Sequence, residues 1–279
     1  SQGIEAKSFS ESGQWQTKSC PTAKGQKWQN EDWKDLIKMA NGCVVKEDWS
    51  QVEAIGNHLA KTHPLAPWGP YFLSLSAQSR KGFSRALWMI ELALKKSPNN
   101  ALAVYQKGRV LWAIEEYGQA TEVFEHALKI NPRILDAHLM LGQIFYRDQE
   151  FKKARDHFQK VVESDRSNYT ALVGLAECEL KSDNFEKALG YFSQAIEKNP
   201  KDLDLRVRKA FVLESTVNDP HEALKEFKEI QRLLAKGRIS GQLSFDLVSK
   251  IKTLEDIVSK VALGKSEGRT PGSKEEVSK

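Results

Sequence analysis

The stretch ALKINPRILDAHLMLGQIFYRDQEFKKA, residues 127–154, contains a proline that recurs along the chain at a fixed distance. Prolines stand at 34-residue steps at Pro64, Pro98, Pro132 and, two steps later, Pro200. Arg166 occupies the one interrupted position of the series. A period of this size indicates a chain built from repeated supersecondary units, so the whole fold depends on what one unit is.

Three consecutive blocks, 101–134, 135–168 and 169–202, agree in four columns when they are aligned on this step. The eighth residue is small, the twentieth is Ala, the twenty-fourth is Phe, and the twenty-seventh is Ala or Val. In column order these residues are Gly108, Gly142 and Ala176; Ala120, Ala154 and Ala188; Phe124, Phe158 and Phe192; and Ala127, Val161 and Ala195.

Each block is expected to form two helices. The first half, such as DAHLMLGQIFY, has apolar residues at helical spacing, and so does a second half such as FEKALGYFSQAIEK. A polar turn such as RDQEF separates them, and Asn-Pro ends the second helix because Pro does not fit a helix interior. One pair cannot bury its apolar stripe alone, so the pairs should stack into a solenoid. Gly108 and Gly142 are predicted where the two helices of a pair touch, with the Phe column filling the gap to the next pair.

These columns resemble the tetratricopeptide repeat family. The resemblance is strong over 67–202, although the start PWGPYFLSLSAQSR is atypical, and it is weaker over 33–66 and 203–237. In the last block Ala223 and Phe227 come one residue late, so we expect an insertion in the turn STVNDPHEA. The resemblance implies an all-α fold, a right-handed α-solenoid of about six helix pairs spanning 30–237, closed by a capping helix within 238–263.

The segments outside the repeats carry several open questions. Residues 1–29 and 264–279 are polar and are expected to be disordered, or docked in the case of the first. Trp15 and Trp28 lie in the first segment, and we expect them to dock on the N-terminal end of the solenoid. Two alternatives remain: the tail is a ligand for another protein, or the tryptophans fill the core of an atypical cap. The capping helix could also form a coiled-coil dimer, but its apolar seam of little more than two heptads slightly favours a monomer.

Composition narrows the function classes. The chain has 42 Lys and Arg against 37 Asp and Glu, mixed along the helices, which argues against nucleic-acid binding. The sequence contains no phosphate-binding loop, nucleophile elbow or zinc-protease motif, so we predict no enzyme activity, no metal and no cofactor.

Cys20 and Cys43 could form a bridge in an oxidising compartment or stay free thiols. The chain begins with Ser, which we interpret as processing or trimming, and a removed signal peptide is compatible with this start. Cytoplasm and bacterial periplasm both stay open, and no membrane-spanning segment is expected.

The resemblance also implies a binding site. In the family the second, fifth, ninth, twelfth and thirteenth residues of each first helix face a concave groove. Carried over, the groove is lined by Trp68, Tyr71, Tyr105, Arg109, Trp112, Leu139, Gln143, Tyr146 and Arg147, and it continues through Thr170, Val173, Glu177, Leu180 and Lys181. Trp, Tyr and Arg dominate binding energy at interfaces, although these aromatic residues could instead pack only between helices. The family's clamp for a terminal carboxylate is absent, because Tyr71, Leu75, Tyr105 and Arg109 hold its positions.

The function expected from these observations is that of a non-enzymatic scaffold or adaptor. It would bind a protein segment with apolar anchors, and an acidic group nearby, in its groove and help assemble a larger complex. Two alternatives stay open at this point: an exported assembly or pilotin-like factor of a bacterial envelope machine, and a regulatory subunit of an enzyme encoded elsewhere.

Overall fold

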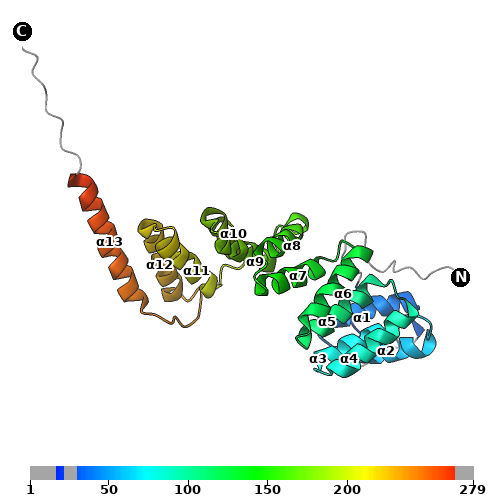
Figure 1. Cartoon of the computed structure of the whole chain (residues 1–279). Coiled ribbons are helices and arrows are strands. Elements are labelled where there is room, and N and C mark those ends of the chain that lie inside the picture. The colour runs from blue at the N-terminus through cyan, green and yellow to red at the C-terminus, as the bar shows by residue number, and fades with distance from the viewer. Residues whose placement is uncertain (1–16, 22–29, 268–279) are drawn as a thin grey trace, which may run out of the picture. The chain divides into compact units, whose positions relative to one another are not determined.

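The computed structural model describes residues 17–21 and 30–267, and within these ranges every regular element is a helix (Figure 1). The elements are α1 (Trp33–Val45), α2 (Trp49–Thr62), α3 (Trp68–Ser79), α4 (Phe83–Lys96), α5 (Ala101–Ala113), α6 (Tyr117–Ile130), α7 (Leu135–Arg147), α8 (Phe151–Ser164), α9 (Tyr169–Lys181), α10 (Phe185–Lys198), α11 (Leu203–Phe211), a π-helical turn η2 (Val212–Thr216), α12 (Pro220–Ala235) and α13 (Leu247–Glu267). The chain divides into two compact units, residues 1–150 and 151–279, so α1–α7 belong to the first and α8–α13 to the second. None of the helices within the described ranges has the length and hydropathy needed to cross a bilayer.

The turn inside each helix pair repeats the same backbone conformation. A residue with φ between 56° and 66°, in the left-handed region, follows each first helix: Glu47, Lys81, Glu115, Gln149, Asp183 and Asn218. The first five lie 34 residues apart and the sixth lies 35 residues after its predecessor. The extra residue of this last pair lies in η2, because a π-helix holds more residues per turn than an α-helix. The left-handed residue Asn218 therefore comes one position later than in the other pairs. The insertion therefore sits at the end of α11, slightly earlier than the sequence predicts.

Helix α12 shows why its start was predictable from the sequence. The carboxylate of Asp219 accepts hydrogen bonds from the backbone N–H groups of His221 and Glu222, each at 3.1 Å. Pro220 occupies the first helical position, where its missing N–H costs nothing. Asn100, Asn168 and Asp202 cap α5, α9 and α11 in the same way.

The small and aromatic columns form the contacts between helices. A Cβ added to Gly108 on α5 would lie 2.6 Å from the ring of Phe124 on α6, which confirms Gly108 at the contact within a pair. Gly142 is buried on α7. A Cβ on Gly174 would lie 2.6 Å from the ring of Phe158, so this Phe reaches from α8 to the next pair. Phe192 is fully buried in the core that α9, α10 and α11 share.

The N-terminal segment 17–21 packs on α1. Cys20 and Cys43 are both buried and form a disulfide with their Cα atoms 4.7 Å apart, which decides the alternative that the sequence left open. The backbone N–H of Lys18 donates to the carbonyl of Lys38 at 3.0 Å. Trp15 and Trp28 lie outside the described residues, so the docking of the polar tail stays a prediction.

The C-terminal helix α13 packs on the last pair. Leu247, Ile251 and Leu254 are buried in one core with Phe227 and Ile230 of α12. The helix begins at Leu247, and the non-helical residues before it bring the ring of Phe245 to 5.2 Å from that of Phe211. Ile257 and Val261 are exposed and Val258 is half-buried, so α13 packs on α12 mainly through its first two turns.

Candidate functional site: the first-helix faces of the two units

The predicted groove begins in the first unit, where the structure corrects two of its residues. Trp68 is 2% and Tyr71 is 4% exposed, so neither side chain is available to a ligand. Helix α3 is apolar on every side, and all of its residues from Trp68 to Ala77 are buried. A helix that is apolar all round belongs in the interior, which is the physical reason that this atypical block departs from the family pattern.

The next helix, α5, keeps its predicted residues partly accessible. Tyr105 and Arg109 are half-buried. A chain of side-chain hydrogen bonds links Arg109 to α3: Arg109 donates to the Gln106 Oε1 at 3.3 Å, and the Gln106 Nε2 donates to the Gln78 Oε1 at 2.9 Å. The Gln78 amide then donates to the backbone carbonyl of Arg109 at 3.3 Å. The guanidinium of Arg109 is thus held in one orientation beside Tyr105.

Trp112 is the most accessible aromatic residue among the nine predicted positions. Its side chain is 37% exposed, one helical turn after Arg109 on α5. On α7, Leu139, Gln143 and Tyr146 are half-buried. That Trp112 and Tyr146 lie side by side stays a prediction.

Arg147, which the sequence predicts in a positive rim, is exposed and has two partners of its own. Its guanidinium lies 3.4 Å from the centroid of the Tyr117 ring and donates to the Asp148 Oδ1 at 2.9 and 3.1 Å. Because Arg147 is the last residue of α7, its side chain reaches the turn between helices, where these two partners stand. Arg109, by contrast, forms no ion pair with a carboxylate among the residues that the structure describes, so its charge is not paired in this way.

An acid lies near the aromatic residues of this face. Burial raises the pKa of Tyr71 above its ordinary range, and the negative charge of Asp136 adds to the effect. Burial and Asp136 also raise the pKa of Tyr105. Both phenols are neutral at physiological pH and can donate a hydrogen bond, but nothing in this arrangement activates a nucleophile.

The second unit carries a cavity on the same helix columns. It lies between α9 and α11, has a volume of about 560 Å³, and is lined by Tyr169, Val173, Asp202, Asp204, Leu205, Val207, Arg208 and Phe211. Val173 was expected in the groove. The second, fifth and ninth residues of the last block are Asp204, Val207 and Phe211, so the column rule also applies there. These three residues are not predicted from the sequence, because the block is degenerate and the insertion in its turn hides that its first helix keeps the column register.

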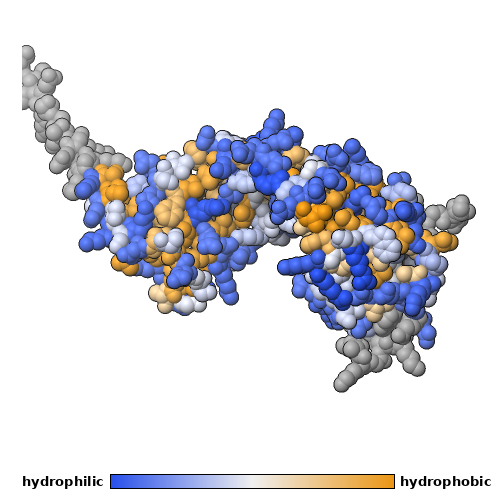
Figure 2. Space-filling model, turned by 60° about the horizontal axis from the view of Figure 1, so that its bottom comes forward, coloured by the Kyte–Doolittle hydropathy of each residue, from blue (hydrophilic) through white to orange (hydrophobic). Residues whose placement is uncertain are grey.

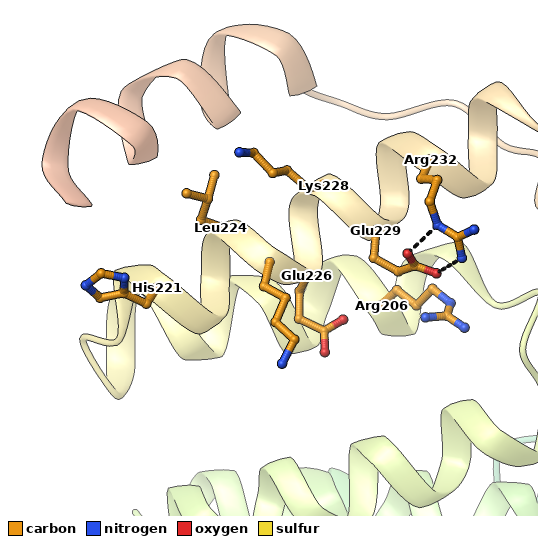
Figure 3. Close-up of a pocket in the computed structure, with 8 residues that line it drawn as sticks. Arg206, His221, Leu224, Glu226, Lys228, Glu229 and Arg232 are labelled. Atoms are coloured by element: carbon orange, nitrogen blue, oxygen red, sulfur yellow. Dashed lines mark hydrogen bonds and ion pairs between the residues drawn. The ribbon is translucent and has the colours of Figure 1, made fainter. Parts of the chain in front are cut away.

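A cavity of about 570 Å³ also lies along α12, and its lining is mostly charged: Arg206, His221, Leu224, Lys225, Glu226, Lys228, Glu229 and Arg232 (Figure 3). Arg232 donates to both carboxylate oxygens of Glu229 at 2.6 Å, and Lys228 points toward α13, where it pairs with Glu255 at 2.7 Å. Lys225 and Glu226 also form ion pairs, with Glu222 and Lys209, so most of the charges that line this cavity are already paired. Apolar side chains reach the surface elsewhere in both units, among mostly hydrophilic residues (Figure 2).

Candidate catalytic and metal groups are few. Cys178 is the one free thiol among the described residues; it is fully buried on α9, and burial raises its pKa to about 12. A thiol so protonated is a poor nucleophile. Within residues 17–21 and 30–267, no three His, Cys, Asp or Glu side chains gather in a way that could hold a metal ion.

Comparisons with known proteins agree with the repeat architecture. A family model described as tetratricopeptide repeat matches residues 101–134, and one described as the TT21 fifth ARM repeats domain matches residues 136–239. A search of curated proteins found no significant match.

Several solved structures share the fold. PilF of Pseudomonas aeruginosa is 16% identical with a TM-score of 0.63, covering 74% of this chain and 94% of its own. YrrB, described as a tetratricopeptide repeat protein with an unusual peptide-binding site, is 22% identical with a TM-score of 0.56, covering 63% and 90%. MamA of Desulfovibrio magneticus RS-1 is 20% identical with a TM-score of 0.54, covering 58% and 92%.

At these identities the solved structures show a common fold and nothing finer. Together with the matched repeat, the 34-residue columns and the repeated left-handed turns, they show that this chain has the helix-pair fold of tetratricopeptide repeat structures, and that residues 101–134 match that repeat.

Proposed function

We propose that the protein is a non-enzymatic scaffold that binds a protein segment on the first-helix face of its repeats and helps assemble a larger complex. Trp112 carries the proposal for the first unit. It is a large aromatic side chain that stays 37% exposed, in a predicted groove column, one turn from a guanidinium held by its own hydrogen bonds. Trp and Arg are the side chains that most often contribute large binding energies in protein interfaces.

The chemistry of this face fits a segment with an apolar anchor and an acid. Trp112 offers apolar area to the anchor, and Arg109 offers a charge-assisted hydrogen bond to a carboxylate. Arg109 is half-buried, so its charge is less screened than that of a fully exposed arginine.

The test uses two tryptophans of the same unit. Trp112→Ala should weaken binding of partners from a native cell extract by at least about 2 kcal/mol, which is roughly thirtyfold in affinity. Trp88→Ala is the matched control, because Trp88 is 65% exposed on α4, a second helix, outside the predicted columns. A thermal melt of each variant accompanies the pull-down. If Trp112→Ala keeps every partner that the wild type binds, the binding face is elsewhere.

The disulfide favours one of the more specific roles, an exported assembly factor. Bridges such as Cys20–Cys43 form and persist in oxidising compartments such as the bacterial periplasm. The measurement is alkylation of thiols in intact cells followed by mass spectrometry of the peptides that contain Cys20 and Cys43. Complete alkylation of both residues in freshly lysed cells would refute export.

A further inference from the structure

The cavity between α9 and α11 has an apolar wall that is already in place. Phe211, at the end of α11, packs edge-on against Phe227 at 5.4 Å and against Phe245 at 5.2 Å between ring centroids. Val173 and Val207 continue this wall and are half-buried. Because neighbouring rings fix Phe211, a ligand would not have to order it, which removes part of the entropy cost of binding.

The cations around the cavity are already neutralised. Arg208 forms an ion pair with Glu177 across the two helices. Lys250 of α13 lies 5.2 Å from the centroid of the Phe211 ring and pairs with Glu214 at 2.7 Å. Arg208 and Lys250 thus each have an acid as partner already.

The start of α11 carries two carboxylates, and neither has an ion-pair partner among the residues that the structure describes. Asp202 accepts the backbone N–H of Leu205 at 2.8 Å and the hydroxyl of Tyr169, so it is held in place by neutral donors. Asp204 forms no hydrogen bond and no ion pair with any residue that the structure describes. Asp202 is the N-cap of α11 and Asp204 lies in its first turn, where the helix dipole favours acids but supplies only about half an elementary charge. The site therefore keeps a net negative charge in a chain whose overall charge is +5.

We propose that this cavity binds an extended protein segment that inserts an apolar side chain against Val207 and Phe211 and pairs a Lys or Arg with Asp204. Charge complementarity selects this occupant, because the unpaired carboxylates attract a basic segment and repel an acidic one. The aromatic ring of Tyr169 lies beside them and can also interact favourably with a cation. The inference rests on the proposed function, but it assigns the second unit a preference opposite in sign to that of Arg109 in the first. The segment recognised here is basic and apolar.

The experiment measures fluorescence anisotropy of two labelled octapeptides, GALKVLAG and its twin GALEVLAG, with the full chain. The Lys peptide should bind about tenfold more tightly than the Glu twin, since one contributes an ion pair and the other a like-charge contact. Asp204→Asn should reduce this difference severalfold, because it removes the proposed partner of the Lys while Asp202 keeps its charge. Asp204 makes no structural hydrogen bond, so its loss should not unfold α11. Asp156→Asn, an exposed acid on α8 with the same change in net charge, should preserve the difference.

A second variant locates the binding. Val207→Phe fills the cavity and should weaken both peptides, while a thermal melt confirms that the chain is folded. The proposal is overturned if the Lys peptide does not bind wild type below about 1 mM, if Asp204→Asn behaves like Asp156→Asn, or if Val207→Phe binds normally. None of these outcomes bears on the pull-down with Trp112→Ala, so failure here is distinguishable from failure of the proposed function.

Discussion

Replacement of Gly108 by Ala tests the packing inside a repeat. The new Cβ would stand 2.6 Å from the nearest ring atom of Phe124, whereas carbon atoms in good contact lie about 3.5–4.0 Å apart. Phe124 is fully buried, and its ring already lies 5.7 Å from that of Tyr105, so it has no free space into which to move by the missing ~1 Å.

Two opposing contributions set the size of the effect. Overpacking a well-packed core costs about 1–3 kcal/mol. Replacing a helical Gly by Ala stabilises by about 0.4–1 kcal/mol, because the unfolded chain loses conformational freedom. The packing cost is larger, so Gly108→Ala should lower the free energy of unfolding by about 1–2 kcal/mol. For a unit of this size, this corresponds to a Tm lower by about 2–8 °C.

The control comes from the partner helix. A Cβ on Gly118 of α6 would meet no atom within 4 Å, so Gly118→Ala should raise stability by about 0.4–1 kcal/mol. Urea titrations of both variants, and of Gly108→Ala in a Phe124→Leu background, complete the assay. The smaller Leu should relieve part of the clash and give a measurable coupling between the two positions. If Gly108→Ala is as stable as Gly118→Ala, or if Phe124→Leu leaves the penalty unchanged, the assigned contact is wrong.

Three further measurements probe other parts of the molecule. Cys43→Ser removes a bridge between residues 23 positions apart and should cost about 3 kcal/mol; a reducing agent should lower the Tm of wild type but not that of the variant. Glu115 has φ 66°, so Glu115→Val should destabilise the unit by about 1–2 kcal/mol in a thermal melt, while Glu115→Gly should not. Burial and the hydrogen bond to Asp202 raise the pKa of Tyr169 from 10.0 to about 12. Because the folded pKa lies above the unfolded one, its contribution is complete below pH ~10 and is lost as pH rises toward ~12, which denaturant titrations of wild type and Tyr169→Phe across that range will check.

The repeat is a property that the sequence determines by itself. Helix pairs begin at 34-residue steps because each unit must present the same small, aromatic and turn residues at the same places to stack on its neighbours. Local chemistry is sufficient for the helix boundaries: Asp219 and Pro220 start α12 through bonds to residues two and three positions away. The one insertion is visible as a shift of Ala223 and Phe227, although the position of the extra residue within η2 is not.

Tertiary structure decides which residues of a predicted column a ligand can reach. Tyr71 and Tyr105 occupy the same column of α3 and α5, yet the first is buried and the second is half-buried, because exposure depends on what the neighbouring elements cover. Arg147 and Asp204 differ in the same way: both are charged residues in groove columns, but only Arg147 meets partners, in Tyr117 and Asp148. The bridge between Cys20 and Cys43 likewise requires two segments distant in sequence to bring their Cα atoms within 4.7 Å. The position of a residue in a column specifies the direction in which its side chain leaves the helix axis. Whether that side chain is buried, forms an ion pair or forms a disulfide depends on residues elsewhere in the chain.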